Sequence, residues 1–340
     1  MTNKKITKIL SVVFLVYAIS FLVHESLERP RVLILHSYYT DFSWVNEINV
    51  GINRVLWDRP YNIRYHYMDT KRHPSLEFKL KAGATARKMI ERWRPDVIIA
   101  FDDNAQEYVG KYFVDDPNIS IFYGGVNADP AQYGYDKASN VSGISETIPW
   151  ALAVDQIKEV LGKNARLLHL SDDSPSSEAV HESVMKFNWA PFEFVGSKQI
   201  GNFNEWKAAV KHAENTVDCL LITHYHTIKD PNDPERVVKP ASVIKWTEAN
   251  SNVPTLGFAR FFVEDGGTLA VGLSPFEQGE VPARMAVRII EKGITCREIK
   301  RQDNRLFTMY VRKSAFPKRF SEKMPLEIEA FAHAVDGCYD

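Results

Sequence analysis

The chain has 340 residues, of which 45% are apolar and 25% are charged, a balance typical of soluble globular proteins of about two domains. Its 42 Lys and Arg residues against 43 Asp and Glu residues give a formal net charge of -1. A nearly neutral chain without a basic stripe lacks the electrostatic footprint of nucleic-acid binding, so we expect no nucleic-acid partner.

The first 28 residues differ from the rest of the chain. The basic segment MTNKKITK precedes fifteen uncharged residues, ILSVVFLVYAISFLV, in the order of a secretory signal peptide. Ala18 and Ser20 would allow cleavage before Phe21, whereas the apolar continuation to Val23 favours an uncleaved membrane anchor, although one short of a full span of about 20 residues. Both alternatives place the body in the periplasm or another extracytoplasmic space, and the second tethers it to the inner membrane.

From residue 31 onward, short apolar runs alternate with segments of helical periodicity. Strands are predicted at 31–37, 61–70, 96–103, 119–126, 141–146, 165–173, 192–200, 218–226, 254–259, 268–274 and 307–314. Helices are predicted at about 43–57, 76–93, 150–162, 176–187, 204–214, 240–250 and 281–292.

This alternation predicts an α/β protein. Continuous apolar strands that alternate with helices form parallel sheets covered on both faces. The strands are too many for one compact sheet, and a break near 141–149 divides them, so we expect two doubly wound parallel-sheet lobes. Ligands of such sheets bind beyond the carboxyl ends of the strands, which directs attention to the residues after each apolar run.

Aromatic and hydroxyl side chains follow the first predicted strand. Ser37, Tyr38, Tyr39 and Trp44 lie at this strand-to-helix turn. The aromatic rings could stack on a flat ligand, or they could pack the start of the helix while the hydroxyls cap it. Both interpretations remain open for Tyr38 and Tyr39, and packing is favoured for Trp44.

Two predicted strands end in paired aspartates, which are Asp102 with Asp103 and Asp172 with Asp173. Asp103 and Gln106 have the spacing of a capping box, and Ser174 before Pro175 is typical of a helix N-cap. The remaining carboxylates could accept hydrogen bonds from a ligand ammonium or hydroxyl group. Metal binding or acid–base catalysis is disfavoured because no third ligand or nucleophile stands at a recognisable spacing.

Two further strand ends carry polar groups. Gly124, Gly125 and Asn127 lie at the end of one strand, where the glycines permit either a tight turn or close approach of a ligand. His224, Tyr225 and His226 come after the apolar run DCLLIT at the end of another, but two histidines without a further ligand are weak evidence for a metal.

Several kinds of site have no signal in the sequence. Nucleotide-binding glycine loops, a serine nucleophile elbow and zinc spacings do not occur, so we expect no catalytic residue, cofactor or metal. Cys219 lies in an apolar run and is predicted to be a buried thiol. Cys296 and Cys338 could pair in an oxidising compartment, although the sequence does not give their separation.

The same strand ends resemble those of ABC-transporter substrate-binding proteins of the type I periplasmic binding fold, closest to an uncharacterised branch related to extracytoplasmic sensor domains. The resembling stretches are VLILHSYYTDFSWVNEINVGI, MDTKR, DVIIAFDDNAQEYV, IFYGGVNAD, VSGISET and GGTLAVGLSPFEQGEVPARMAVRIIEKG. Their order and spacing extend from about residue 31 to 315.

The resemblance implies two lobes joined by three crossovers, expected near 143–147, 257–261 and 273–277. The N-terminal lobe is then expected at 29–145 plus 259–275, the C-terminal lobe at 146–258 plus 276–315, and a helical tail at 316–340. Ligand contacts are expected, by position, at Ser37, Tyr38, Asp102, Asn127, Asp172, Ser174 and His224. Glu146 and Arg260 lie at expected crossovers and could reach inward. Tyr39, Asp103 and Tyr225 are candidates because they adjoin these positions.

The function implied is capture of a small molecule between the lobes, without chemistry, by a monomer that presents it to an ABC permease. A binding protein that informs a membrane sensor is the alternative, and an enzyme such as a two-domain glycosyltransferase is a third possibility, disfavoured by the export signal. Tyr38, Tyr39 and the acidic pairs would suit an amine-bearing, partly flat solute, such as an aromatic amino acid. The segment HYHTIKDPNDPERVVKP departs from the family pattern, so ligand identity does not transfer.

Overall fold

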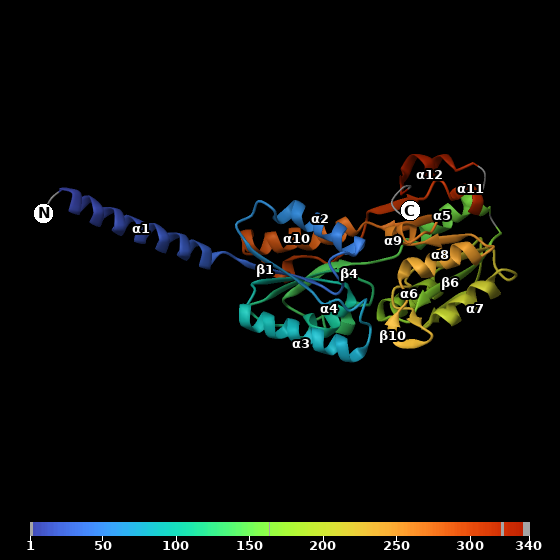
Figure 1. Cartoon of the computed structure of the whole chain (residues 1–340), viewed down its shortest axis with the longest axis horizontal. Coiled ribbons are helices and arrows are strands. Elements are labelled where there is room, and N and C mark those ends of the chain that lie inside the picture. The colour runs from blue at the N-terminus through green and yellow to red at the C-terminus, as the bar shows by residue number, and fades with distance from the viewer. Residues whose placement is uncertain (1–2, 163, 321–322, 336–340) are drawn as a thin grey trace.

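A long N-terminal helix, α1 (Asn3–Glu28), projects from a body of two lobes in the computed structural model (Figure 1). The structure describes residues 3–162, 164–320 and 323–335. Large apolar side chains of α1 between Leu10 and Phe21 are exposed. Within these described ranges, no helix combines the length and the apolar character needed to cross a membrane.

The N-terminal lobe is built on a six-stranded sheet in which every paired strand is parallel, in the order β13-β5-β4-β3-β1-β2. Its strands are β1 (Arg31–His36), β2 (Asn62–Tyr67), β3 (Val97–Phe101), β4 (Ser120–Val126), β5 (Val141–Ser145) and β13 (Gln302–Asp303). Its helices are α2 (Ser43–Leu56), α3 (Leu76–Trp93), α4 (Asp102–Tyr108) and α10 (Pro275–Lys292), with short 3-10 turns at Gly110–Phe113, Pro130–Tyr133 and Cys296–Glu298. Figure 1 shows α2 and α10 on one face of this sheet and α3 and α4 on the other.

The C-terminal lobe has a seven-stranded sheet in the order β15-β14-β12-β11-β8-β6-β7, parallel except where β14 meets β12. Its strands are β6 (Arg166–Asp172), β7 (Glu193–Ile200), β8 (Cys219–Ile222), β11 (Thr255–Gly257), β12 (Leu269–Leu273), β14 (Phe307–Val311) and β15 (Ala332–Ala334). Its helices are α5 (Trp150–Leu161), α6 (Pro175–Lys186), α7 (Phe203–Ala213), α8 (Pro240–Asn250), α9 (Arg260–Glu264), α11 (Phe316–Arg319) and α12 (Leu326–Phe331). A small hairpin of β9 (Lys229–Asp230) and β10 (Asp233–Val237) extends from it.

Continuous apolar runs produce these sheets, as the sequence predicts. All five residues of β3 and of β12 are buried, because helices cover both faces of each sheet. One apolar layer of the C-terminal sheet packs with α5 and α6, and the other packs with α7, α8 and α9. The predicted α/β class with two parallel-sheet lobes is therefore confirmed.

The chain changes lobes at three places, between β5 and α5, between β12 and α10, and between β13 and β14. Crossovers thus occur near the expected 143–147 and 273–277. No change of lobe occurs at 257–261, because β11 and β12 pair with each other in the C-terminal sheet. The third crossover lies at residues 304–306 instead.

The expected lobe assignment of two segments is therefore wrong. Residues 259–273 belong to the C-terminal lobe, and α10 with β13 belongs to the N-terminal lobe. Two glycines explain the position of α10, because a Cβ atom on Gly51 would lie 2.1 Å from the Phe276 carbonyl oxygen and one on Gly279 would lie 2.1 Å from the Ile48 carbonyl oxygen. Without these side chains, α2 and α10 come into backbone contact.

The tail after residue 315 is only partly helical, because β15 adds a parallel strand beside β14 after α12. Cys219 and Cys296 are buried, and neither forms a disulfide with another described residue. Cys338 lies outside the described residues, so its pairing with Cys296 stays a prediction.

Candidate functional site

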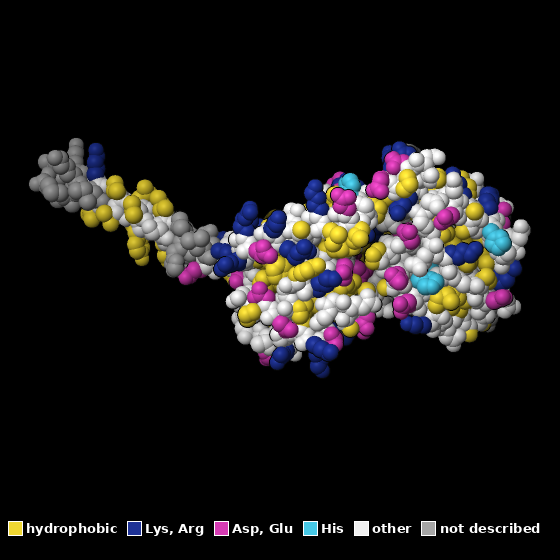
Figure 2. Space-filling model, turned by 90° about the horizontal axis from the view of Figure 1, so that it is seen from below, with side chains coloured by type: hydrophobic (Ala, Val, Ile, Leu, Met, Phe, Trp, Pro, Cys, Tyr) yellow, Lys and Arg dark blue, Asp and Glu magenta, His cyan; other side chains and the backbone are white. Residues whose placement is uncertain are grey.

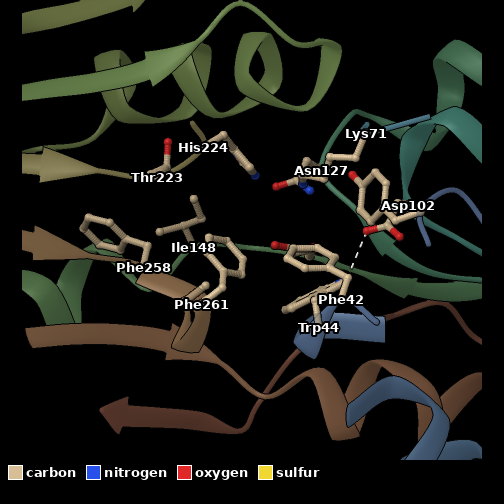
Figure 3. A pocket seen from close by; sticks show the side chains of 13 residues that line it. Phe42, Trp44, Lys71, Asp102, Asn127, Ile148, Thr223, His224, Phe258 and Phe261 are labelled. Atoms are coloured by element: carbon tan, nitrogen blue, oxygen red, sulfur yellow. Dashed lines mark hydrogen bonds between the residues drawn. The ribbon is translucent and has the colours of Figure 1, made fainter. Parts of the chain in front are cut away.

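A cavity lies between the lobes, where the carboxyl ends of both sheets face each other (Figure 3). Its walls come from segments that follow β1, β2, β3, β4, β5, β8 and β11, as expected for parallel sheets. The lining residues are Tyr38, Phe42, Trp44, Lys71, Asp102, Asn127, Glu146, Ile148, Thr223, His224, Phe258, Ala259 and Phe261. About 430 Å³ is free of protein atoms, but the part that water can occupy measures about 30 Å³. In this conformation the cavity has room for about two water molecules.

The cavity has an apolar end and a polar end. Figure 3 shows Phe258, Ile148 and Phe261 together at one end and Lys71 with Asp102 at the other. Such a division suits a solute with a hydrophobic part and a charged part, since apolar walls contribute burial and a few polar groups fix orientation.

Asp102 has the most unusual surroundings of the polar groups. It begins α4 with a φ of 65°, and its side chain is 3% exposed. One carboxylate oxygen, Oδ1, accepts a hydrogen bond from Trp44 Nε1 at 3.1 Å, whereas Oδ2 has no partner among the described residues. Burial raises the pKa of Asp102 well above its usual value, and the charge of Lys71 opposes this shift. A donor on a bound solute would supply the missing partner of Oδ2.

Gly125 makes room for that carboxylate. Its φ is +66°, a conformation that side chains disfavour, and a Cβ there would stand 3.2 Å from Asp102 Oδ1. Gly124 and Gly125 lie within β4, and the close approaches they permit are those of Gln278 and Asp102 of the protein itself; the approach of a ligand at these glycines stays a prediction.

The MDTKR turn after β2 places Lys71 in the cavity. Asp69 has a φ of 55°, and Arg72 donates to both of its carboxylate oxygens at 2.7 Å. Thr70 Oγ1 donates to the Ser37 carbonyl oxygen at 2.7 Å, which ties the turn to β1. The turn is thus held from two sides, and Lys71 between these anchors faces inward.

The Lys71 ammonium lies against aromatic faces. Its Nζ is 4.1 Å from the centre of the Tyr38 ring and 5.1 Å from that of Phe42. Burial lowers the pKa of Lys71, although Asp102 and Asp172 act in the opposite direction. Cation–π contacts stabilise a partly desolvated charge without neutralising it, so the ammonium can still attract an anionic group.

His224 and Asn127 add two further unpartnered atoms. His224 Nδ1 and Asn127 Oδ1 have no hydrogen-bond partner among the described residues. Burial, and next the charge of Lys71, lower the pKa of His224 to about 4. The imidazole is therefore neutral at pH 7, with one nitrogen that donates and one that accepts.

Glu146 reaches the cavity from the first crossover, as expected. Burial, followed by the charge of Asp103, raises the pKa of Glu146 to about 8, although Lys71 and a hydrogen bond from Asn127 lower it. A carboxyl group with this pKa is mostly protonated at neutral pH, and it can then donate as well as accept.

Asp172 and Ser174 lie at the matching strand end of the other lobe but do not line the cavity. The Ser174 and Ser177 hydroxyls donate to Asp172 Oδ1 at 2.7 and 2.5 Å, and the Thr227 backbone N–H donates to Oδ2 at 3.0 Å. Burial alone would raise the pKa of Asp172, but His224 and these hydroxyls lower it to about 2. Ser174 caps α6, which confirms the predicted N-cap.

The capping box predicted for Asp103 and Gln106 is wrong. Strand β3 runs directly into α4, so Asp103 already lies inside the first helical turn. Gln106 donates to the Ala100 carbonyl oxygen at 3.0 Å instead. Asp103 accepts from Tyr133 at 3.0 Å and, across the cleft, from the Ser176 hydroxyl at 2.8 Å. Asp103 therefore joins the two lobes.

Arg260 also joins the lobes and does not line the cavity. It forms an ion pair with Glu47 of α2 and, at 2.8 Å, another with Glu264 of its own helix. Because α9 belongs to the C-terminal lobe, the Glu47–Arg260 pair crosses the cleft at a groove beside the cavity.

Three other candidates have structural contacts. Ser37 Oγ donates to the Phe101 carbonyl oxygen and accepts from the Ala105 N–H, both at 2.7 Å. The Tyr225 hydroxyl donates to Asp265 at 2.7 Å, and Tyr39 packs beneath Arg72 in the adjacent groove. These contacts position loops, and none of the three side chains lines the cavity.

Five sequence candidates thus meet in the cavity, namely Tyr38, Asp102, Asn127, Glu146 and His224. The sequence analysis missed Lys71, although the MDTKR stretch contained it, and it missed Thr223 and the apolar residues that follow β5 and β11. No cluster of three or more His, Cys, Asp or Glu side chains that could hold a metal occurs among the residues described.

Comparisons with known proteins agree with this architecture. The family model for ABC transporter substrate binding protein matches residues 46–324. No curated protein matches the sequence.

Solved structures share the fold at low sequence identity. A domain from Streptococcus pneumoniae in complex with L-Trp is 16% identical with a TM-score of 0.69. A conserved domain protein from Vibrio cholerae is 16% identical with a TM-score of 0.68. A substrate-binding protein with adhesive properties from Clostridium difficile, in a ligand-free open form, is 17% identical with a TM-score of 0.60. Each alignment covers 90% of this chain and 99% of the other.

Proposed function

The chain belongs to the ABC transporter substrate-binding protein family, and we propose that it captures one small solute in the cavity between its lobes and presents it to an ABC permease. The family and the solved neighbours are binding proteins. The observation that carries the proposal is a buried carboxylate oxygen at the wall of this cavity, Asp102 Oδ2, which has no hydrogen-bond partner in the described part of the chain. Unpartnered buried oxygens are rare in proteins, and a ligand donor is a simple explanation.

The solute class we propose is an amine that also carries a flat apolar group. A bound ammonium group would favour the ionised form of Asp102 against the effect of burial and donate to its Oδ2. The apolar end around Phe258, Ile148 and Phe261 would bury the flat group. Lys71 would bind a carboxylate on the same solute, which makes an aromatic amino acid a good match. The L-Trp complex of the Streptococcus pneumoniae domain supports this choice.

Capture requires the lobes to move apart, because about 30 Å³ of water-accessible space does not admit an amino acid. We propose hinge motion at the three crossovers. Two contacts across the cleft, Asp103 with Ser176 and Glu47 with Arg260, would form on closure and favour the closed state. The solute adds stability to that state only through contacts that the open state lacks.

The family is extracytoplasmic, and we propose that α1 is either removed as a signal peptide or kept as a tether. The exposed apolar side chains of α1 and the two-residue link to β1 favour a body held close to a membrane if the helix is retained. In that case a membrane sensor is the alternative partner to a permease.

A thermal-shift screen of the protein against amino acids, aromatic amines, sugars, nucleosides and small carboxylates tests the proposal. A solute at a hundred times its dissociation constant should stabilise the fold by about 2.7 kcal/mol. The expected result is a shift with L-tryptophan or another aromatic amine and none with sugars. A shift with sugars alone would overturn the proposed solute class, and no shift with any class would overturn solute capture.

A further inference from the structure

A second feature lies at the end of the N-terminal lobe that is remote from the cleft. A groove of about 690 Å³ opens there beside the first residues of β1 and β2 and the last residues of α3. We name it the arginine groove, and it is lined by Arg31, Tyr61, Asn62, Ile63, Arg64, Arg92 and Trp93.

Three guanidinium groups in this groove have no acidic partner. Among the described residues, no Asp or Glu side chain lies within ion-pair distance of the Arg31, Arg64 or Arg92 guanidinium, whereas Arg72, Arg166 and Arg260 each have such a partner. The carboxylate of Asp96 is nearby but accepts from the backbone N–H of Arg31 at 2.7 Å. Among the described residues these three guanidinium groups therefore form no ion pair, although Asp96 and Glu291 are hydrogen-bonded to the groove residues Arg31 and Tyr61.

Trp93 holds two of these arginines, one through its ring and one through its backbone carbonyl oxygen. The Arg64 guanidinium lies 4.4 Å from the centre of the Trp93 ring, and Arg31 Nη1 donates to the Trp93 carbonyl oxygen at 2.9 Å. Trp and Tyr side chains favour the boundary between water and lipid, where one end of the ring is wet and the other is apolar. Trp93 and Tyr61 give the groove this character beside its charges.

The groove is also next to α1. Only Arg29 and Pro30 separate the end of α1 from β1, whose first residue lines the groove. Figure 2 shows Lys and Arg side chains on the N-terminal lobe near the base of α1, with Asp and Glu side chains among them, and apolar side chains along the described part of that helix. The exposed apolar helix and the three arginines of the groove thus lie at the same end of the molecule.

We propose that the arginine groove binds the surface of an anionic phospholipid membrane. Guanidinium groups bind phosphate oxygens with two parallel hydrogen bonds, and anionic leaflets attract basic segments that lie close to them. The contact orients the body with the N-terminal lobe on the membrane and the C-terminal lobe away from it. The cleft is then held above the lipid surface, where a membrane partner can reach both lobes.

The test measures binding of the full chain to vesicles of phosphatidylcholine alone and of phosphatidylcholine mixed with phosphatidylglycerol. The expected result is stronger binding to the mixed vesicles, weakened by added salt. Arg64→Gln with Arg92→Gln should reduce the excess binding by about fivefold for each arginine removed. Binding to phosphatidylcholine alone, where α1 acts through its apolar surface, should not change.

The matched control is Lys186→Gln with Lys198→Gln, which removes the same charge from exposed positions of the C-terminal lobe. This control should bind mixed vesicles as the wild type does, and thermal unfolding should confirm that both double variants are folded. Equal binding of wild type to both vesicles, or an equal loss in both double variants, would overturn the proposal. So would a preference for an acidic protein surface with no preference for anionic lipid. The outcome is independent of solute capture, which is measured without vesicles.

Discussion

Trp44 donates its indole N–H to one carboxylate oxygen of Asp102 at 3.1 Å, and the other oxygen of Asp102 is buried with no partner in the parts of the chain that the structure describes. The indole fixes the orientation of the carboxylate while leaving one acceptor for a solute. This arrangement keeps a desolvated carboxylate at the polar end of the cavity, opposite the apolar end.

Asp102→Asn should weaken binding of the best solute from the thermal-shift screen by roughly 10- to 100-fold, because a charge-assisted hydrogen bond contributes about 1.5–3 kcal/mol. Calorimetric titration measures the change. Asp173→Asn, which alters an aspartate after the corresponding strand of the other lobe and outside the cavity lining, is the control and should leave affinity within about twofold. Equal affinities of Asp102→Asn and wild type would remove Asp102 from the site.

Lys71→Met should weaken the binding of an amino acid more than the binding of the matching amine that lacks a carboxylate. Only the amino acid has an anionic group that the Lys71 ammonium can bind. Some loss of stability is expected, because removing the ammonium leaves the buried Asp102 without an opposing charge, so thermal unfolding should accompany the titrations to show that the variant is folded. Parallel titrations with L-tryptophan and tryptamine make the comparison. An equal loss for the two solutes would show that Lys71 does not bind the carboxylate.

Gly125→Ala should destabilise the protein by about 1–2 kcal/mol and also weaken solute binding, because its Cβ crowds Asp102 Oδ1 at a φ of +66°. Gly134→Ala is the control, since Gly134 has a φ of +76° with open space around it. It should lose about 1 kcal/mol of stability through backbone strain, with no change in affinity. Urea unfolding and calorimetry separate the two effects, and a matching loss of affinity in both variants would contradict the contact.

Stability should depend on pH through Glu146, whose pKa rises from 4.5 to about 8 on folding. Between these values the folded state retains a proton that the unfolded state releases, so the contribution of Glu146 to the free energy of unfolding falls as pH rises. The free energy of unfolding should therefore decline between pH 5 and pH 8, and Glu146→Gln should remove about 2 kcal/mol of that decline. This is less than the full pKa shift of Glu146 would give, because the residue is not fully buried. Urea unfolding at several pH values measures it, and identical pH profiles would contradict the raised pKa.

The cross-cleft contacts should contribute modestly to affinity through the closed state. Glu47→Gln should weaken solute binding by about two- to fivefold, since exposed ion pairs contribute about 0.2–1 kcal/mol. Ser176→Ala should act in the same direction by removing a donor from buried Asp103. Titration of the single and double variants measures both effects, and a stronger affinity in either would show that these contacts oppose capture.

Much of the fold follows from the sequence because the strands are buried on both faces. Segments such as DVIIAFDD are readily assigned as strands, since a continuous apolar segment of this length bounded by polar residues suits a central parallel strand. The lobe of α10 was predicted wrongly because helical periodicity shows that a helix is amphipathic but does not show which sheet it covers. Its position depends on contacts of Gly51 and Gly279 with distant backbone atoms.

The cavity was only partly predictable for a similar reason. The rule that ligands bind beyond the carboxyl ends of parallel strands leads to Tyr38, Asp102, Asn127 and His224. It does not show that Asp102 has an oxygen with no hydrogen-bond partner among the described residues, whereas both oxygens of Asp172 accept hydrogen bonds. That difference arises from the loop at Thr227 and the serines of α6. Lys71 was missed because lysines are usually solvated, and its burial depends on the faces of Tyr38 and Phe42.

The most direct test of capture between the lobes is a crystal structure with the solute that gives the largest thermal shift. We predict electron density for the solute in the cavity, with its cationic group within hydrogen-bond distance of Asp102 Oδ2 and its flat group against Phe258 or Phe261. Density for the solute at any other surface, with the cavity occupied only by water, would contradict the central claim.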